Sequence, residues 1–355
     1  MSTTLKYDAL LLLGFGGPEG MDEVMPFLER VTAGRGIPPE RLKVVGEHYY
    51  TLGGISPINS QNRALLAALN DAIAAEGIAV DTVLANRNSP PFVADVLGEL
   101  AERGHHRVLA VATAAYSGYS SCRQYRENLG TALADTGLEL EIRKLSPFYD
   151  LPGFTEAITG LLLGCLPSDL DLTADGTRLL FSTHSIPTSM AATAGPDGDG
   201  YLAQHRWVAD RVADGLEAAT GHRLAWQLVF QSRSGPPSMP WLEPDVNDVL
   251  RDLAADGATD VVLAPIGFLS DHVEVIWDLD TEAMATAVEL GIRLVRTPTV
   301  GTHPRFVAGL AARIAAELRT GSPTPSEGQF CFAGCCSNPR REAPVVPGIA
   351  QDPVR

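Results

Sequence analysis

One histidine and a row of carboxylates stand where side chains could transfer protons or bind a metal ion. His184 lies in the phrase Phe181-Ser-Thr-His-Ser-Ile-Pro187, and the apolar run that leads into it predicts a strand over 178–183. A neutral imidazole can accept a proton or bind a metal near pH 7. A lone histidine is often only structural, but ligands in α/β sheets bind beyond the carboxyl ends of strands. We therefore take His184 as a candidate for proton transfer or metal contact.

The carboxylates follow a later apolar run, within residues 265–282. A helix that starts near Asp271 would place three of them at i, i+4 and i+8 on one face. These are Glu274, Asp278 and Glu282. Like charges at this spacing destabilise a helix, whereas oxygen ligands in a row suit a divalent ion that passes inward. The alternative is a solvated acidic face, which does not explain why His272 and Trp277 interleave with the row.

Three of the five cysteines are bunched near the end of the sequence, at Cys331, Cys335 and Cys336. A four-thiolate site needs one more, for which Cys165 is the leading candidate and Cys122 the second. Adjacent cysteines make a poor disulfide pair, and structural zinc sites more often use C-x₂-C units. A 2Fe–2S cluster takes four thiolates without that strict spacing. The pattern favours a cluster, with a zinc site and unmodified thiols as alternatives.

Hydroxyl and basic side chains gather in three places in the N-terminal half, as a carboxylated ligand would require inside an acidic protein. The candidate ligand contacts are Arg35, His48, Tyr49, Ser56, Tyr116, Ser117, Ser121 and Arg126. The last four follow a strand expected over 107–113, so they belong to a loop beyond a strand end, as His184 does.

Two loops resemble ligand-binding motifs but fail the residue test. The turn Gly14-Phe-Gly-Gly-Pro-Glu-Gly20 is not a dinucleotide fingerprint, because position 19 is Glu and Pro18 removes a backbone donor. It is either a glycine-lined turn that gives a flat ligand access to the backbone or simply a tight strand–helix turn. The sequence Asp197-Gly-Asp-Gly is not a calcium loop, because its twelfth position is Val208 instead of Glu.

These candidates require an alternating β/α framework to position them. Strands are expected at 9–15, 79–85, 107–113, 138–145, 178–183, 224–231, 260–267 and 293–297, with helix-period stretches between them. This order predicts an α/β fold with parallel sheets. The strands fall into two sets of four, so we predict two Rossmann-like lobes, each a four-stranded parallel sheet flanked by helices, with a ligand cleft between them. The predicted limits are 1–150 for the first lobe, 151–320 for the second, and 321–355 for a linker, the cysteine segment and a loose tail from Pro344.

Composition narrows the function classes. The 45% of hydrophobic and 20% of charged residues are ordinary for a soluble globular protein, and no apolar run approaches a membrane span of ~18 residues. A net charge of −16 disfavours nucleic-acid binding and is compatible with handling cations. The short apolar run Ala9–Leu13 lacks the flanks of a signal peptide. We expect a cytoplasmic monomer with no integral membrane segment.

Several of these phrases together resemble the ferrochelatase family over nearly the whole chain. The phrases are Leu13-Gly-Phe-Gly-Gly-Pro18, Gly53-Gly-Ile-Ser-Pro-Ile58, Ala115-Tyr-Ser-Gly-Tyr-Ser120, Ser182-Thr-His-Ser-Ile-Pro187, Gln231-Ser-Arg-Ser and Ser270-Asp-His-Val-Glu-Val275. The resemblance implies a porphyrin held between two lobes and an enzyme that inserts Fe²⁺ into it. His184 and Glu274 match the family's catalytic pair and its contacts to the substrate iron. Asp278 and Glu282 match an acidic path for iron entry.

The resemblance is strongest to soluble bacterial members that use coproporphyrin III and give coproheme in haem synthesis, to be passed to a transient partner. Some members hold a 2Fe–2S cluster with one mid-chain and three C-terminal cysteines, an arrangement that Cys165, Cys331, Cys335 and Cys336 fit. Two positions depart from certain relatives. Phe15, a predicted substrate contact, replaces a metal-contacting tyrosine, and Asn88 replaces a histidine.

Three other functions remain open on the residues alone. They are a ferrochelatase for protoporphyrin IX, a cobalt chelatase of the same superfamily, and a tetrapyrrole carrier or iron sensor without catalysis. The roles of His184 and Glu274 are also open, since either could take a pyrrole proton while the other meets the metal.

Overall fold

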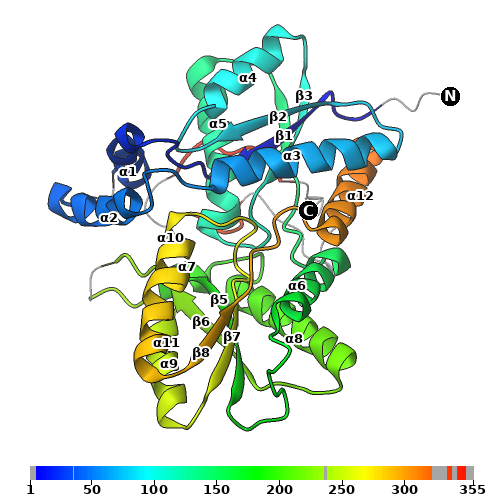
Figure 1. Ribbon diagram of the computed structural model, residues 1–355. Helices are drawn as coiled ribbons and strands as arrows, with labels where there is room; N and C mark the ends of the chain where they lie inside the picture. The colour runs from blue at the N-terminus through cyan, green and yellow to red at the C-terminus, as the bar shows by residue number, and fades with distance from the viewer. Residues whose placement is uncertain (1–4, 35, 236–237, 322–333, 338–341, 349–355) are drawn as a thin grey trace. The chain divides into compact units, whose positions relative to one another are not determined.

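The computed structural model describes residues 5–34, 36–235, 238–321, 334–337 and 342–348 (Figure 1). Two predicted site residues, Arg35 and Cys331, lie outside the described residues. The chain divides into two compact units. The first consists of Met1–Ala114, Tyr119–Pro147 and Leu310–Arg355, and the second of Ala115–Gly118 and Phe148–Gly309. The limits predicted at 150 and 320, and the cleft between the lobes, stay predictions.

The first unit is built on a parallel sheet of order β2-β1-β3-β4. Its strands are β1 (Ala9–Gly14), β2 (Asp81–Asn86), β3 (Arg107–Ala112) and β4 (Glu141–Lys144). Its helices are η1 (Met21–Glu23), α1 (Val24–Thr32), α2 (Pro39–Thr51), α3 (Ile58–Ala75), α4 (Val93–Glu102), η2 (Tyr119–Arg123), α5 (Gln124–Thr136) and the later part of α12 (Pro304–Thr320). Every residue of β1 is buried, as expected for a strand covered on both faces.

The second unit repeats this plan with a parallel sheet of order β6-β5-β7-β8. The strands are β5 (Thr177–His184), β6 (Trp226–Gln231), β7 (Asp260–Ala264) and β8 (Arg293–Arg296). The helices are α6 (Pro152–Cys165), α7 (Thr188–Ala192), α8 (Gly200–Thr220), α9 (Val246–Ala255), α10 (Val273–Val275), η3 (Ile276–Ala283) and α11 (Met284–Leu290). The pair α6–α8 and the pair α9–α11 cover opposite faces of this sheet (Figure 1). The predicted pair of four-stranded parallel sheets with flanking helices is confirmed.

The segment after Pro344 is not loose where the structure describes it. Val346 is buried in the core of the first unit, its backbone N–H donates to the Arg126 carbonyl, and Gly348 forms a parallel bridge with Lys144 of β4. Gly130 of α5 allows this approach, because a Cβ there would lie 2.6 Å from the Pro344 carbonyl. The expectation of a loose tail was wrong for residues 344–348, because an apolar side chain and a glycine opposite it let the segment dock.

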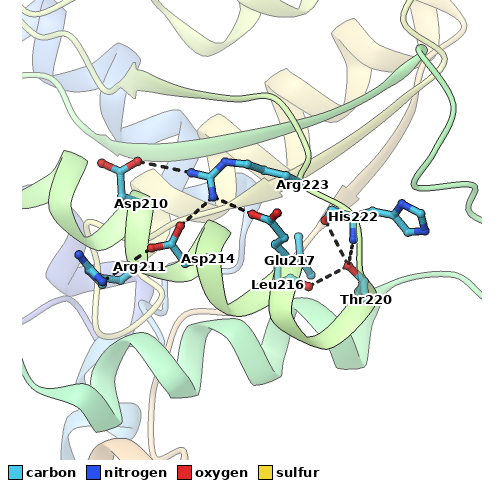
Figure 2. A network of polar contacts seen from close by, with 8 residues as sticks. All are labelled: Asp210, Arg211, Asp214, Leu216, Glu217, Thr220, His222 and Arg223. Carbon is cyan, nitrogen blue, oxygen red and sulfur yellow. Dashed lines mark hydrogen bonds and ion pairs between the residues drawn. The ribbon is translucent and has the colours of Figure 1, made fainter.

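A polar network on the surface of α8 secures the end of that helix (Figure 2). Arg223 lies just beyond the helix and its guanidinium is 2.7 Å from Asp214, 2.9 Å from Glu217 and 4.0 Å from Asp210. All four side chains are substantially exposed, and exposed ion pairs each contribute less than about 1 kcal/mol. The network therefore links the segment just beyond α8 to the last turns of that helix, and none of its residues is a candidate site residue.

Within the part of the chain that the structure describes, no helix combines the length and apolar character needed to cross a membrane.

Candidate active site

His184 is the last residue of β5, and its imidazole lies beside the carboxylate of Glu274. The distance from His184 Nε2 to Glu274 Oε2 is 3.5 Å, and the two side chains are 35% and 44% exposed. On its other side the ring bonds the Ser185 carbonyl through Nδ1. A carbonyl oxygen only accepts, so Nδ1 carries the hydrogen and Nε2 is the nitrogen that can gain or lose a proton next to Glu274.

The surroundings of His184 favour its protonated form. Burial lowers the pKa of the imidazole, but the hydrogen bond and charge of Glu274 raise it by more, with a further contribution from the Ser185 carbonyl. The net pKa is raised above the usual 6.5. A proton accepted at Nε2 is therefore stabilised by the neighbouring carboxylate, which is the property that a general base needs.

Glu274 is held at the start of a helix that runs without a break from Val273 to Leu290, through α10, η3 and α11. His272 caps this helix, because its Nδ1 accepts a hydrogen bond of 3.4 Å from the Val275 backbone N–H. The cap explains why the helix begins two residues later than expected from Asp271. Burial is the main reason that the pKa of His272 is lowered, which keeps the ring neutral and able to accept this bond.

Asp278 occupies the next turn and is bound from the neighbouring strand end. The Gln231 amide donates to its Oδ2 at 3.2 Å, and the Ser232 hydroxyl donates to the same oxygen. Burial raises the pKa of Asp278 most, and the charges of Glu274 and Glu282 raise it further against the effect of the Ser232 hydroxyl. The pKa reaches about 7, so this carboxyl exchanges its proton near neutral pH.

The three carboxylates of the predicted row thus lie near enough to influence one another. Ile276–Ala283 is a π-helix, a form that is rare and often found at functional sites. Glu282 is exposed and accepts a hydrogen bond of 2.8 Å from the Trp277 indole N–H. Among the described residues, no group of three or more His, Cys, Asp or Glu side chains is arranged to hold a metal ion.

Arg296 ties the loop before this helix to the helix itself. Its guanidinium donates to Asp271, and its Nε lies 3.3 Å from Asp280 Oδ1. The Arg296 side chain is only 11% exposed, and its guanidinium at the end of β8 pairs with these two carboxylates. This contact holds the backbone on both sides of Glu274.

Two predicted ligand contacts, Tyr116 and Ser117, are buried inside the second unit. The Tyr116 hydroxyl donates to the Ile266 carbonyl at 2.8 Å. The Ser117 backbone N–H donates to Gln204 at 2.7 Å, and the Gln204 amide donates back to the Ser117 hydroxyl at 2.8 Å. Both side chains therefore have partners inside the unit, and their role toward a ligand stays a prediction.

The predicted contacts of the first unit differ in exposure. Phe15 follows β1 and its ring packs edge-on against Phe27, with the Arg87 guanidinium 5.4 Å from the ring centroid. Asn88 stands where some relatives have histidine. Its side-chain amide donates a hydrogen bond of 3.0 Å to the backbone carbonyl of Phe15. Tyr49 packs against Phe27 and is buried.

The remaining contacts of that unit are Ser56, His48, Ser121 and Arg126. Ser56 is buried and His48 is half-buried. The Ser121 hydroxyl is buried and has no hydrogen-bond partner among the described residues. Arg126 is only 2% exposed, and its Nε donates to the Val346 carbonyl at 2.8 Å. Its guanidinium thus holds the C-terminal segment, which the sequence did not indicate.

The cysteines can be compared only in part, because Cys331 lies outside the described residues. Cys335 and Cys336 are both buried, with their sulfurs 3.5 Å apart. Two thiolates on one tetrahedral metal ion with bonds of ~2.3 Å lie about 3.8 Å apart, so this spacing suits a shared metal and not a disulfide. Cys165 ends α6 in a half-buried position, and Cys122 is buried in η2. The described cysteines do not form a group of three or more that could hold a metal ion, so the predicted cluster stays a prediction.

Three residues of this site were given no role in the sequence analysis: Gln231 and Ser232, which belong to one of the phrases that carry the family resemblance, and Arg296. All three stand at or just after strand ends, at the same edge of the sheet as His184, which is a signal that could have identified them. The backbone of Ser232 has a positive φ of 60°. Non-glycine residues rarely adopt this conformation, and it is common at functional sites.

The chain is similar to known proteins over nearly its whole length. The family model described as ferrochelatase matches residues 7–318. The chain is 48% identical to the coproporphyrin III ferrochelatase of Propionibacterium freudenreichii, across 98% of this chain and 99% of that protein. It is 50% identical to the protein of that name from Streptomyces griseus, across 93% of each. It is 47% identical to the one from Leifsonia xyli, across 97% of this chain and 95% of that protein.

Among solved structures, SirB from Bacillus subtilis with Fe3+ has a similar fold, with a TM-score of 0.52 and 14% identity over 91% of this chain and 98% of that chain. That likeness concerns the fold alone. The family match spans both units and includes the helix of Glu274 and the strand of His184. The chain therefore belongs to the ferrochelatase family.

Proposed function

We propose that the protein inserts Fe²⁺ into coproporphyrin III to give Fe-coproporphyrin III, a step of haem biosynthesis. Relatives at 47–50% identity that match nearly their whole length bear the name coproporphyrin III ferrochelatase. The single structural observation that carries the proposal is the 3.5 Å distance between Nε2 of His184, at the end of β5, and Oε2 of Glu274, at the start of the helix that follows β7. Such a pair can take up a proton beside a site that attracts a cation.

Metal insertion requires that two pyrrole N–H protons leave while Fe²⁺ meets the four ring nitrogens. In a flat ring the nitrogen lone pairs point inward, so binding contacts that bend the ring make them accessible. We assign proton acceptance to His184 Nε2, because the Ser185 carbonyl fixes the hydrogen on Nδ1. Nε2 takes up the two protons one after the other, and the first leaves to solvent past the partly exposed Glu274 carboxylate before the second is accepted. Glu274 stabilises the imidazolium that forms, as the raised pKa of His184 indicates.

For iron entry we propose the row Glu274, Asp278 and Glu282. Oxygen ligands suit a hydrated divalent cation, and a net charge of −16 attracts cations to the protein. Asp278 has a pKa of about 7, so it can release its proton as a cation approaches. The proposed porphyrin contacts are Phe15, Arg35, His48, Tyr49, Ser56, Tyr116, Ser117, Ser121 and Arg126.

The decisive experiment is an anaerobic assay of Fe²⁺ with coproporphyrin III and, in parallel, with protoporphyrin IX, followed by absorbance. We expect the metalloporphyrin spectrum to appear faster with coproporphyrin III. A higher kcat/KM for protoporphyrin IX would replace the proposed substrate, and cobalt insertion faster than iron insertion would replace the metal. Porphyrin binding without any metalloporphyrin spectrum would indicate a carrier.

The role of His184 is tested by His184→Ala. Removal of a general base typically costs about 10²–10⁴-fold in rate, so we expect kcat to fall by that order. Porphyrin affinity, measured by fluorescence quenching, should stay within severalfold. His222→Ala is the matched control, because His222 is exposed at the end of α8 and belongs to no candidate site. Turnover of His184→Ala at the control's rate would refute the assignment.

We also propose a 2Fe–2S cluster held by Cys165, Cys331, Cys335 and Cys336. The spacing of the Cys335 and Cys336 sulfurs supports it. Metal insertion consumes no electrons, so a cluster would serve stability or redox sensing and not turnover.

Purified protein should be brown and contain iron and sulfide, and Cys336→Ser should lose both. Cys165→Ser and Cys122→Ser form the matched pair that identifies the fourth ligand, since we expect only the former to lose the colour. A colourless wild type without sulfide, purified anaerobically, would end the cluster proposal.

A further inference from the structure

A buried hydrogen-bonded group lies beneath His184 in the second unit. It consists of Thr183 of β5 and of Tyr201 and His205, which are one turn apart in α8. Thr183 Oγ1 is 2.9 Å from the Tyr201 hydroxyl and 2.9 Å from His205 Nε2. The Tyr201 hydroxyl also donates to the His184 carbonyl at 2.8 Å. All three side chains are 6% exposed or less, so water does not compete for these bonds.

The direction of each bond follows from the donors present. The Tyr201 carbonyl, 2.7 Å from His205 Nδ1, only accepts, so the hydrogen of the imidazole is on Nδ1. Burial lowers the pKa of His205 to about 3, so the ring is neutral and Nε2 accepts from the Thr183 hydroxyl. Because the Thr183 hydrogen goes to His205, the single hydrogen of the Tyr201 hydroxyl serves both the His184 carbonyl at 2.8 Å and Thr183 Oγ1 at 2.9 Å. The Tyr201 hydroxyl thus ties the backbone of His184 to α8.

The same group also holds the segment that leads to Glu274. The His205 ring stacks on Tyr116 with centroids 3.6 Å apart, and the Tyr116 hydroxyl donates to the Ile266 carbonyl just after β7. At the next residue, the Gly267 N–H donates to the Ser182 carbonyl at 3.2 Å. A Cβ on Gly267 would lie 2.2 Å from Thr183 Oγ1, so the two segments touch at Thr183.

We propose that Thr183, Tyr201 and His205, with Tyr116 stacked on them, are positioning residues that set His184 relative to the segment bearing Glu274. The proposal rests on the proposed function, since it assigns these residues to the pair that performs proton transfer. They act through the His184 and Ile266 carbonyls and touch neither the imidazole nor the carboxylate of the pair. Catalytic pairs lose rate steeply when displaced, and a shift of about 1 Å can cost about 10²-fold.

The test uses two substitutions that remove one hydroxyl each with little change of shape, Tyr201→Phe and Thr183→Val. The matched control is Thr177→Val, at the other end of the same strand. Thr177 is buried, and its hydroxyl donates to the Asp171 carbonyl at 2.8 Å, at the opposite end of β5 from His184. We expect kcat for iron insertion to fall about 10- to 100-fold in the first two variants, with the porphyrin KM within twofold. Thr177→Val should keep the wild-type kcat despite a comparable loss of thermal stability.

A second readout is independent of turnover. In protein labelled with ¹⁵N-histidine, the ring signals of His184, identified by their loss in His184→Asn, should shift in Tyr201→Phe and Thr183→Val but not in Thr177→Val. Equal kcat in Thr183→Val and Thr177→Val, or unshifted ring signals in both test variants, would overturn the proposal. If the wild type inserts no iron but the ring signals shift as expected, the proposed function fails while the positioning contact stands.

Discussion

At the scale of single residues, burial and neighbouring charge combine differently to shift the pKa values of three groups in the second unit. Burial lowers the pKa of both His184 and His205, but only His184 has a carboxylate close enough to reverse the effect. Asp278 is raised by burial and by its acidic neighbours together. Neighbouring charge, more than depth, therefore separates a histidine suited to proton transfer from one suited to holding structure.

His205 makes stability depend on pH. Its folded pKa of about 3 lies below the ~6.5 of an unfolded chain, so between these values only the unfolded chain binds the proton. The neutral His205 ring makes its full contribution to the free energy of unfolding above pH ~6.5. As the pH falls from ~6.5 toward about 3, that contribution decreases by about 1.4 kcal/mol per pH unit. Urea unfolding at pH 7.5 and 5 should show the stability advantage of wild type over His205→Gln shrinking by about 2 kcal/mol. Parallel pH curves would contradict this, as would a wild-type His205 ring that protonates above pH 5.

At the scale of elements, β8 carries two arginines that differ in what they hold. Arg296 is 11% exposed and bridges Asp271 and Asp280 around the start of the long helix. Arg293 is 40% exposed and pairs with Asp260 and Asp169 on the surface. The two pairs look alike in the sequence, but only the first secures the backbone beside Glu274.

Arg296→Gln should therefore cost more than Arg293→Gln. We expect a loss of unfolding free energy of about 1–3 kcal/mol for Arg296→Gln, below the value for a fully buried pair because Asp280 is 39% exposed. Arg293→Gln should lose less than about 1 kcal/mol. Urea denaturation of both variants measures the difference, and kcat should fall only in Arg296→Gln. Equal losses in both measurements would argue against a positioning role for Arg296.

The sequence allowed the strands to be predicted within a few residues, because strands covered on both faces are continuously apolar. The sequence also singled out His184 and Glu274, which lie at the end of β5 and at the start of the helix after β7 with their side chains 3.5 Å apart, while their catalytic role stays a prediction. The π-helical form of Ile276–Ala283 was not predictable, because its apolar period resembles that of an α-helix. The Arg296 clamp and the Tyr201 bond depend on residues 25 and 17 positions away, which spacing rules do not reach.

At the scale of the whole molecule, the units are not consecutive stretches of chain. The first unit takes in residues from Leu310 onward, including the later part of α12 and the docked segment around Val346. The sequence order of strands predicted two sets of four but gave no signal of this return. Val346 could not be predicted as a core residue from the sequence, because its burial depends on Gly130 of α5, which lets the segment approach.

Two helical glycines test the docking. Gly130→Ala places a Cβ 2.6 Å from the Pro344 carbonyl, so it should displace the segment and lower the thermal midpoint. Gly98→Ala in α4 meets nothing within 4 Å, and the helix preference for alanine should stabilise the protein by about 0.5–1 kcal/mol. Thermal unfolding and protease cleavage near residue 344 report the result. If both alanines stabilise, the docked segment is not a part of the first unit's core.

The return of the chain to its first unit has a consequence for biosynthesis. A ribosome adds residues in order, and domains generally fold as units once their residues have emerged. The second unit has all its residues once Gly309 has left the exit tunnel. The first unit, which holds the sheet of β1 to β4, has all its residues only after α12 and Val346 have been synthesised. The unit whose synthesis starts first is therefore the last to have all its residues.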